Sequence, residues 1–232
     1  ARYYWLDRVH RVAGDDAIDP LARERNLDAH LGNLAWTLPL GTLVGYAYLV
    51  EDRDVATAST QSMGLRWTGS RGFGGSTLGW SLEGANQRDY GNNPRDVNVD
   101  YRFAEASLAR GAVTGKLGWE RLGSDGRSAF QTPLATLHAF NGWADKFLVT
   151  PVDGLDDRYA LATGKFGSGR LQDKLAWTVA WHDFRADRGG AAYGSEWNAS
   201  LGFPLPGGLL GLVKLADYRS DGFARDTLKA WF

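Results

Sequence analysis

The sequence predicts an all-β protein, a closed antiparallel transmembrane β-barrel of about twelve strands that follow one another in an up-and-down meander. Three observations predict this fold. Segments of about ten residues alternate apolar and polar side chains, which is the length a tilted strand needs to cross a bilayer. The connections between these segments alternate between short and long. The last segment ends on the aromatic Phe232, a terminal residue typical of bacterial outer-membrane barrels.

The bulk composition is compatible with a barrel. The 232 residues are 44% hydrophobic, with a mean hydropathy of −0.34 and a net charge of −1. No run of about 18 apolar residues is present, so the sequence contains no transmembrane helix. A search for long apolar runs does not detect a β-barrel, because only every second residue of a strand must face lipid. The 10 tryptophans, 9 tyrosines and 10 phenylalanines suit aromatic girdles at the membrane interfaces.

Alternation and turn residues together predict the strands. They are expected at 2–12, 26–38, 42–52, 60–70, 77–89, 97–110, 113–123, 157–167, 174–186, 195–204, 209–219 and 226–232. The apolar sides are clearest in five strands: Leu78, Trp80 and Leu82; Val97, Val99, Tyr101 and Phe103; Val113, Leu117 and Trp119; Leu175, Trp177, Val179 and Trp181; Trp197, Ala199, Leu201 and Phe203. The opposite sides carry many Gly, Ser, Thr and Asn residues. We therefore expect the apolar sides to face lipid and the polar sides to face a lumen.

The connections provide a second argument. Short ones are expected at 39–41, 71–76, 111–112, 168–173 and 205–208, and longer ones at 13–25, 53–59, 90–96, 124–156, 187–194 and 220–225. Outer-membrane barrels have short periplasmic turns and longer outer loops. An even strand count then puts both termini on the periplasmic side, where the barrel-insertion machinery can bind Phe232. We expect one domain over 1–232, in a chain that is mature, trimmed or part of something longer.

Charged residues on the polar sides are the candidates for the lumen wall. A charge facing lipid at mid-bilayer costs about 2–4 kcal/mol, which makes their direction predictable. The predicted pore-lining residues are Arg66, Glu83, Asp100, Arg102, Lys116, Glu120, Lys174, His182, Glu196, Lys214 and Lys229. Such a wall can orient a charged solute. The alternative is that opposite charges pair across strands and only hold the barrel together.

The long connection at 124–156 is rich in Phe, Leu and Trp, so we expect it to fold over the lumen and narrow it. Packing on the barrel rim or on a neighbouring subunit is the alternative. The residues of this predicted constriction loop are Phe130, His138, Trp143, Asp145 and Lys146.

The same region carries a family resemblance. The runs 130–138 and 140–148, together with 156–159, 181–187, 193–197 and 214–218, resemble the alginate-export-like outer-membrane porins. The resemblance covers about 124–232 well and the first half loosely. It implies a monomeric channel with a charged lumen for anionic sugar polymers or small solutes. Members of that family resemble larger barrels of about eighteen strands, so this chain departs from them in its number of strands.

The predicted function is a passive outer-membrane porin for small or anionic solutes, sugar acids included. No cofactor is implied, the absence of cysteine excludes thiolate chemistry, and the scattered basic residues favour no nucleic-acid partner. A side-chain-plugged or engineered barrel scaffold without transport is one alternative. A second is an outer-membrane hydrolase, although no histidine lies in a His-x-Ser-Asn-Gly motif. A Trp-rich soluble β-sandwich is a third.

Overall fold

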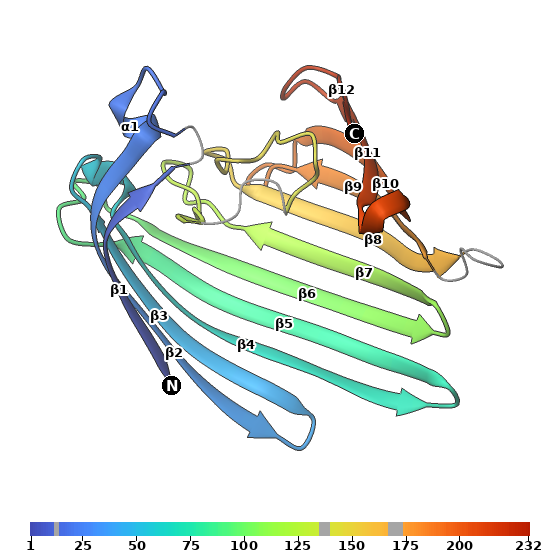
Figure 1. The fold of residues 1–232 in the computed structure, drawn as a ribbon. Helices are drawn as coiled ribbons and strands as arrows, with labels where there is room; N and C mark the ends of the chain where they lie inside the picture. Colours follow the sequence, from blue (N-terminus) through green and yellow to red (C-terminus); the bar gives the residue numbers. More distant parts are fainter. Residues whose placement is uncertain (12–13, 135–139, 167–173) are drawn as a thin grey trace.

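The computed structural model describes residues 1–11, 14–134, 140–166 and 174–232. Its twelve strands form one antiparallel sheet in which neighbours in the sequence are neighbours in space, from β1 to β12 (Figure 1). The strands are β1 (Arg2–His10), β2 (Glu24–Leu38), β3 (Gly41–Asp52), β4 (Thr60–Phe73), β5 (Ser76–Asp89), β6 (Asn98–Arg110), β7 (Val113–Leu122), β8 (Leu155–Phe166), β9 (Leu175–Arg185), β10 (Ala192–Pro204), β11 (Leu210–Ser220) and β12 (Thr227–Trp231). Helical segments in the described ranges are short: α1 (Pro20–Arg23) and the 3-10 turns η1 (Ala56–Ala58) and η3 (Pro206–Gly208).

The prediction of an all-β, up-and-down sheet of twelve strands is confirmed. The rhythm of the connections holds from β1 to β8, but the connection between β8 and β9, residues 167–174, is longer than the one between β9 and β10, residues 186–191. β2 and β3, β4 and β5, and β6 and β7 are each joined by two residues, whereas the connections at the other end are longer. In the turn between β4 and β5, Gly74 and Gly75 both have positive φ, at 53° and 77°. That backbone conformation suits glycine and matches the twist of a tight hairpin. Among the described residues, no helix has the length and apolar character needed to cross a membrane.

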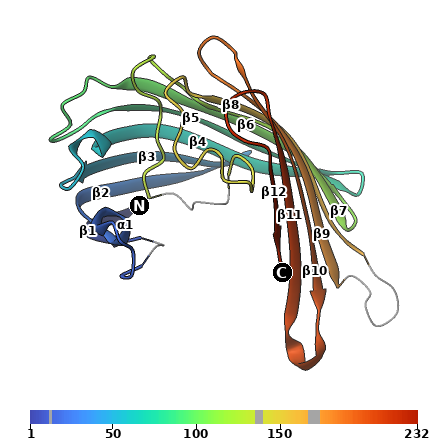
Figure 2. The same cartoon turned by 90° about the horizontal axis from the view of Figure 1, so that it is seen from above.

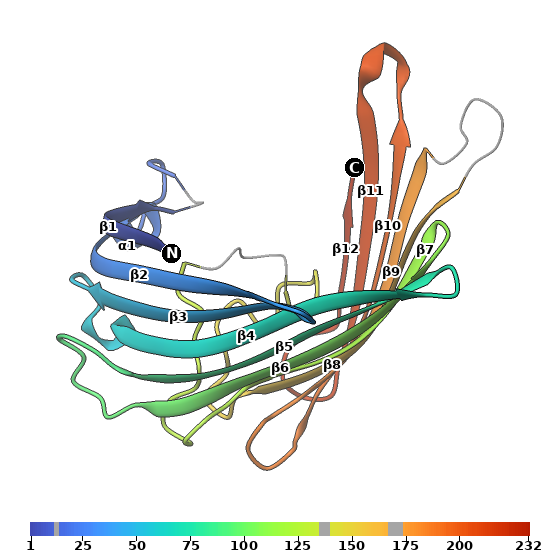
Figure 3. The ribbon, with the colours of Figure 1, turned by 90° about the horizontal axis from the view of Figure 1, so that it is seen from below.

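Closure into a barrel is the one feature of the predicted fold that is not seen. β1 and β12 are the two edges of the sheet and are not paired with each other. The sheet instead curves into a deep trough, with its first and last strands standing apart across the concave side (Figures 2 and 3). The diameter of a closed barrel depends on its number of strands. A sheet that curves as gently as this one leaves a gap between edges after twelve strands.

The convex side is apolar through the middle of the sheet, as the alternation predicts. Leu117 of β7 is 69% exposed there, and Met63 and Leu65 of β4 are also exposed. Trp181 and Trp197 are direct partners on β9 and β10, and both point outward. Large apolar side chains that point away from a sheet into the surroundings fit a wall that is bathed in lipid rather than a dry soluble core.

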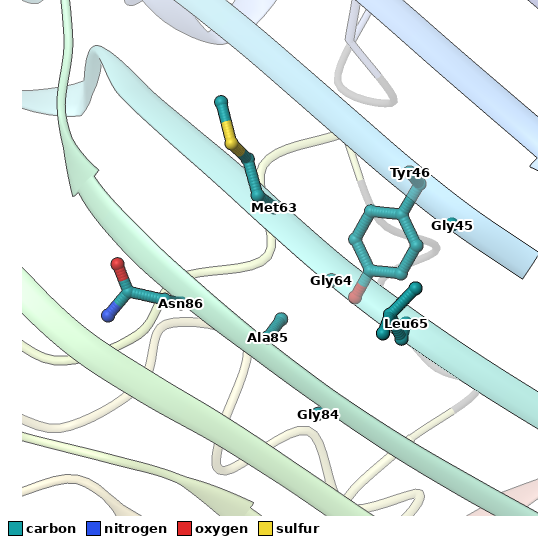
Figure 4. A pocket seen from close by; sticks show the side chains of 8 residues that line it. All are labelled: Gly45, Tyr46, Met63, Gly64, Leu65, Gly84, Ala85 and Asn86. Carbon is teal, nitrogen blue, oxygen red and sulfur yellow. The ribbon is translucent and has the colours of Figure 1, made fainter.

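Cross-strand pairs of an aromatic residue and a glycine explain part of the high glycine content. A side chain on Gly118 would come within 2.1 Å of the ring of Tyr159, its partner on β8. A side chain on Gly64 would come within 2.5 Å of the Tyr46 hydroxyl. Figure 4 shows the Tyr46 ring reaching from β3 across β4 at Gly64. These glycines leave room for aromatic rings to lie over the neighbouring strand, an arrangement that stabilises glycine-containing strands.

The substitution Gly118→Ala tests this packing. We expect it to displace the Tyr159 ring and to lower the free energy of unfolding by about 1–3 kcal/mol, the usual cost of overpacking. The matched control is Gly115→Ala on the same strand, because no atom lies within 4 Å of the added group there. Urea unfolding of the protein in lipid vesicles measures both variants. Equal stabilities of the two variants would contradict the packing argument.

Candidate functional site

In the connection between β7 and β8, residues 123–134 and 140–154 lie on the concave side of the sheet (Figures 2 and 3). We call its described residues the inner loop. Phe130, Ala144 and Phe147 of this loop are buried in one apolar cluster with wall residues. The Phe147 ring is 4.6 Å from that of Phe184 on β9, measured between centroids, and 5.3 Å from that of Phe223. The inner loop is therefore packed against the wall as a part of the folded structure.

One end of the inner loop is attached to β5 through a pair of amides. The Gln131 backbone N–H donates to the Gln87 side chain at 2.8 Å, and the Gln87 side chain donates to the Gln131 carbonyl at 2.8 Å. The Gln131 side chain repeats this pattern with the backbone of Thr150, at 3.0 and 3.1 Å. Gln87 and Gln131 thus link the wall to two separate parts of the loop, around Gln131 and around Thr150.

The middle of the inner loop is held by buried acidic residues of the wall. The Asn141 side chain donates to Glu120 on β7 at 2.7 Å and to Asp157 on β8 at 3.2 Å. The Ala144 backbone N–H donates to the Glu196 carboxylate on β10 at 2.8 Å. Asp157 in turn contacts the ring of His182 at 3.0 Å. These carboxylates are covered by the loop, so their role in the structure is to hold it.

The far side of the inner loop is attached to the last strands by cations. Lys229 of β12 pairs with Asp145 at 2.6 Å, and Lys146 donates to the Thr227 hydroxyl at 2.7 Å. The Lys214 ammonium lies 4.3 Å from the centre of the Trp143 ring, within the range of a cation–π interaction.

The beginning of the inner loop is a turn closed by a carboxylate. Asp125 accepts the backbone N–H groups of Arg127 and Ser128, both at 2.7 Å. Burial acts to raise the pKa of Asp125, but these donors, together with the Asn98 backbone N–H group and the charge of Arg127, hold the pKa below its ordinary value. The turn is therefore stabilised at neutral pH, and this contribution is lost as the pH falls through the lowered pKa.

Most of the predicted lumen residues lie on the concave side. Register and contacts place them there: Arg66, Glu83, Lys116, Glu120, His182, Glu196, Lys214 and Lys229. Of the predicted loop residues, Phe130, Trp143, Asp145 and Lys146 contact the wall as described above. Lys174 lies in the turn that precedes β9 and is exposed. His138 lies outside the described residues.

Asp100 and Arg102 are corrections, because both point to the convex side. Their neighbour Tyr101 faces inward, where its hydroxyl donates to Glu120 at 2.7 Å and its ring lies 5.2 Å from Phe130. Successive side chains of a strand point to opposite faces, so Asp100 and Arg102 point outward and pair with each other at 2.9 Å. The expected direction fails here because the inner loop makes the concave side apolar at this level, and Val99 and Tyr101 pack under it.

Beyond the inner loop, the concave side carries ion pairs across neighbouring strands. Arg66 lies 3.5 Å from Glu83, and Lys116 lies 2.9 Å from Glu105. In each pair the side chain of the cation is more exposed than that of the acid. The exposed fraction is 49% for Arg66 and 14% for Glu83, and 36% for Lys116 and 18% for Glu105. The same is true of Lys229 and Asp145, at 34% against 23%. A solute on this side therefore meets positive charge first.

Several important concave residues were not predicted from the sequence. Tyr46, Tyr101 and Tyr159 donate to Glu83, Glu120 and Glu105 at 2.6, 2.7 and 2.7 Å. Of the three, the sequence analysis assigns only Tyr101 to a side, the lipid side, because its ring is apolar, but a tyrosine hydroxyl needs a partner when the ring is buried. The alternation gave a signal for Tyr159, which shares its parity with Asp157 and Thr163, but not for Tyr101, which shares its parity with Val99 and Phe103.

The described residues give little support for catalysis or metal binding. No group of three or more His, Cys, Asp or Glu side chains that could hold a metal ion occurs among them. In that part of the chain, the histidines contact Tyr3, Glu24, Asp28 and Asp157 rather than a serine hydroxyl.

Comparison with solved structures finds outer-membrane proteins of Pseudomonas aeruginosa. OccK3 (OpdO) matches with a TM-score of 0.67 and 19% identity, over 98% of this chain and 62% of its own. The outer membrane protein OpdK matches with a TM-score of 0.62 and 17% identity, over 90% of this chain and 55% of its own. The chain has an outer-membrane porin fold. OccK2 (OpdF) in complex with glucuronate shares it, with a TM-score of 0.61 and 17% identity, over 97% of this chain and 59% of its own.

The chain therefore spans about three fifths of the length of these porins. No family model matches it, and no curated protein does. The alginate-export-like resemblance thus stays a prediction at the level of the family, within a porin fold that is common to both.

The substitution Glu196→Ala tests the attachment of the inner loop. We expect trypsin to cut at Lys146 roughly tenfold faster, because the variant loses a buried hydrogen bond to the loop backbone and opens it more often. The matched control is Glu196→Gln, which keeps an oxygen acceptor for the Ala144 N–H group. Digestion of the folded protein in detergent, followed by mass spectrometry, locates the cut. An unchanged rate for Glu196→Ala would show that the loop is held by other contacts.

Proposed function

We propose that this protein is a passive channel of the bacterial outer membrane for small anionic solutes, sugar acids among them. The observation that carries the proposal is the exposure of the cations in the concave ion pairs. Arg66, Lys116 and Lys229 each extend past the acidic residue that they pair with. Cations held in this way attract and orient a passing carboxylate, while the paired acids fix their positions.

Two further observations support anionic sugars as the solute class. OccK2 (OpdF), one of the porins of this fold, has been crystallised in complex with glucuronate, which is a sugar acid. The residues of 124–232 resemble the alginate-export-like porins, whose name refers to a polymer of sugar acids. We extend both to this chain because its concave wall has the charge that such solutes need.

The proposed path runs along the concave wall and past the inner loop. The pore-lining residues are the concave charges Arg66, Glu83, Lys116, Lys214 and Lys229, and the constriction is formed by the part of the loop around Trp143, Asp145 and Lys146. Glu120, His182 and Glu196 lie under the loop and hold it. The loop thus narrows the path without blocking the cations of β4 and β7.

The proposal includes a closed barrel with both termini periplasmic and Phe232 available to the insertion machinery. An edge strand in lipid would leave its N–H and C=O groups unpaired, at a cost of several kcal/mol each. The edges at β1 and β12 therefore require pairing in the membrane. The two-residue turns that join β2 to β3, β4 to β5 and β6 to β7, with longer loops at the other end of these strands, support the orientation.

A scaffold without transport is the second candidate. It is favoured by the packing of the inner loop on the concave side, where Phe130 and Phe147 fill space with buried aromatic rings. Current steps in a planar bilayer distinguish the two functions, because a plugged barrel produces none.

Two substitutions in the Arg66–Glu83 ion pair, one removing the cation and one removing the acid, test the proposed selectivity for anionic solutes. We expect Arg66→Gln to lower the permeation of glucuronate relative to neutral glucose severalfold, because it removes the exposed cation. Glu83→Gln is the matched variant and should raise this ratio, since it removes the paired acid and keeps an acceptor for the Tyr46 hydroxyl. Swelling of proteoliposomes measures both solutes. Equal ratios in both variants and the unaltered protein would contradict selection by charge.

Removal of the inner loop tests the constriction. Deletion of residues 128–150 should raise the single-channel conductance severalfold, because the loop occupies the concave side. Replacement of the same residues by a Gly-Ser segment of equal length is the control, and it separates loss of the packed loop from shortening of the chain. Unchanged conductance in the deletion variant would exclude the loop as the narrowest point.

A further inference from the structure

The convex side carries a repeated pair of an aspartate and an arginine where the strands approach the longer loops. The pairs are Asp100 with Arg102 on β6, Asp156 with Arg158 on β8, Asp183 with Arg185 on β9, and Asp217 with Arg219 on β11, each joined through the arginine Nε at 2.9 to 3.0 Å. They form a charged band across several strands. Its regularity distinguishes it from scattered surface charge.

The arginines of β8 and β9 are positioned to act together. Arg158 is the register partner of Asp183, and Asp156 is the register partner of Arg185, so the four charges form a compact set on adjacent strands. The Arg158 side chain is 61% exposed, whereas Asp156 is 16% exposed. The aspartate therefore holds the guanidinium from below through Nε, and the terminal NH₂ groups remain open for a ligand.

An apolar groove begins next to this set. It is lined by Leu117, Trp119, Ala160 and Trp181 around Arg158, and it continues over small residues such as Ala162 toward the middle of the sheet. Trp119 is fixed at the head of the groove by its hydrogen bond to Asp156 at 2.8 Å. The groove is lined by alanine, leucine and tryptophan side chains, which offer apolar contact to a hydrocarbon chain.

We propose that the convex side of β7 to β9 binds one phosphorylated glycolipid of the outer leaflet. Its phosphate lies between Arg158 and Arg185, and one acyl chain lies in the groove below. Guanidinium groups bind phosphate oxygens in a bidentate manner, and burial of the chain against the groove adds apolar contact. A free anion has no acyl chain that could bind in the groove, and a neutral lipid has no phosphate that could bind the arginines. The inference rests on the proposed orientation of the channel, with its longer loops outside the cell.

The test measures binding of bisphosphorylated lipid A and of its dephosphorylated form to the purified protein in detergent, by native mass spectrometry. We expect the phosphorylated form to bind more tightly, and the double variant Arg158→Gln with Arg185→Gln to lose at least about tenfold of that affinity. Arg219→Gln is the matched control, because Arg219 has the same kind of partner but does not border the groove, and it should bind like the unaltered protein. Equal binding of both lipids, or no loss in the double variant, would overturn the proposal.

A second variant tests the groove without a change of charge. Ala160→Trp fills the groove beside Arg158 and should weaken lipid A binding. Unchanged affinity in this variant would contradict binding of an acyl chain in the groove. Conductance is measured in parallel on the double arginine variant, which should conduct like the unaltered protein because both residues face away from the lumen. A silent channel that retains phosphate-dependent binding would contradict only the proposed function. A conducting channel without such binding would contradict only this inference.

Discussion

The need to pair every backbone N–H and C=O group in a medium without water is the constraint on which the rest of this structure depends. A sheet meets it through an unbroken ladder of neighbours, from β1 to β12. Once the ladder is continuous, side chains alternate strictly between two surroundings. Each segment of the sequence then has one lipid side and one inner side, and its residues can be assigned without any knowledge of distant contacts.

This constraint explains why so much of the fold was predictable from sequence. The twelve strands, and the rhythm of their connections from β1 to β8, were predicted close to the observed positions. The outward direction of Leu117, Trp181 and Trp197 also follows from alternation alone. Barrel closure was not predictable in the same way, because it depends on the curvature of the whole sheet, to which no single segment contributes a distinct pattern.

The sequence interpretation failed where a second surface covers the concave side. Under the inner loop, Val99 and Tyr101 face inward because the loop provides an apolar partner, and the charges of Asp100 and Arg102 are displaced to the outside. Apolar side chains on a strand indicate that the surface they face excludes water. Lipid and a packed loop both exclude water. Polarity alone cannot distinguish the two. Hydrogen-bonding capacity is more informative, since three of the inward tyrosines, Tyr46, Tyr101 and Tyr159, donate to a carboxylate.

Part of the attachment of the inner loop uses main-chain atoms of the loop. The N–H groups of Gln131, Ala144 and Thr150 all donate to side-chain oxygens, two of them on the wall and one on the loop itself. Attachment of this kind places few demands on which side chains the loop carries. Loop side chains that make no contact with the wall can therefore be exchanged in the course of evolution while the loop keeps its path. A protein built in this way can acquire a new solute preference by substitutions in the loop alone, with no cost to the strands that support it.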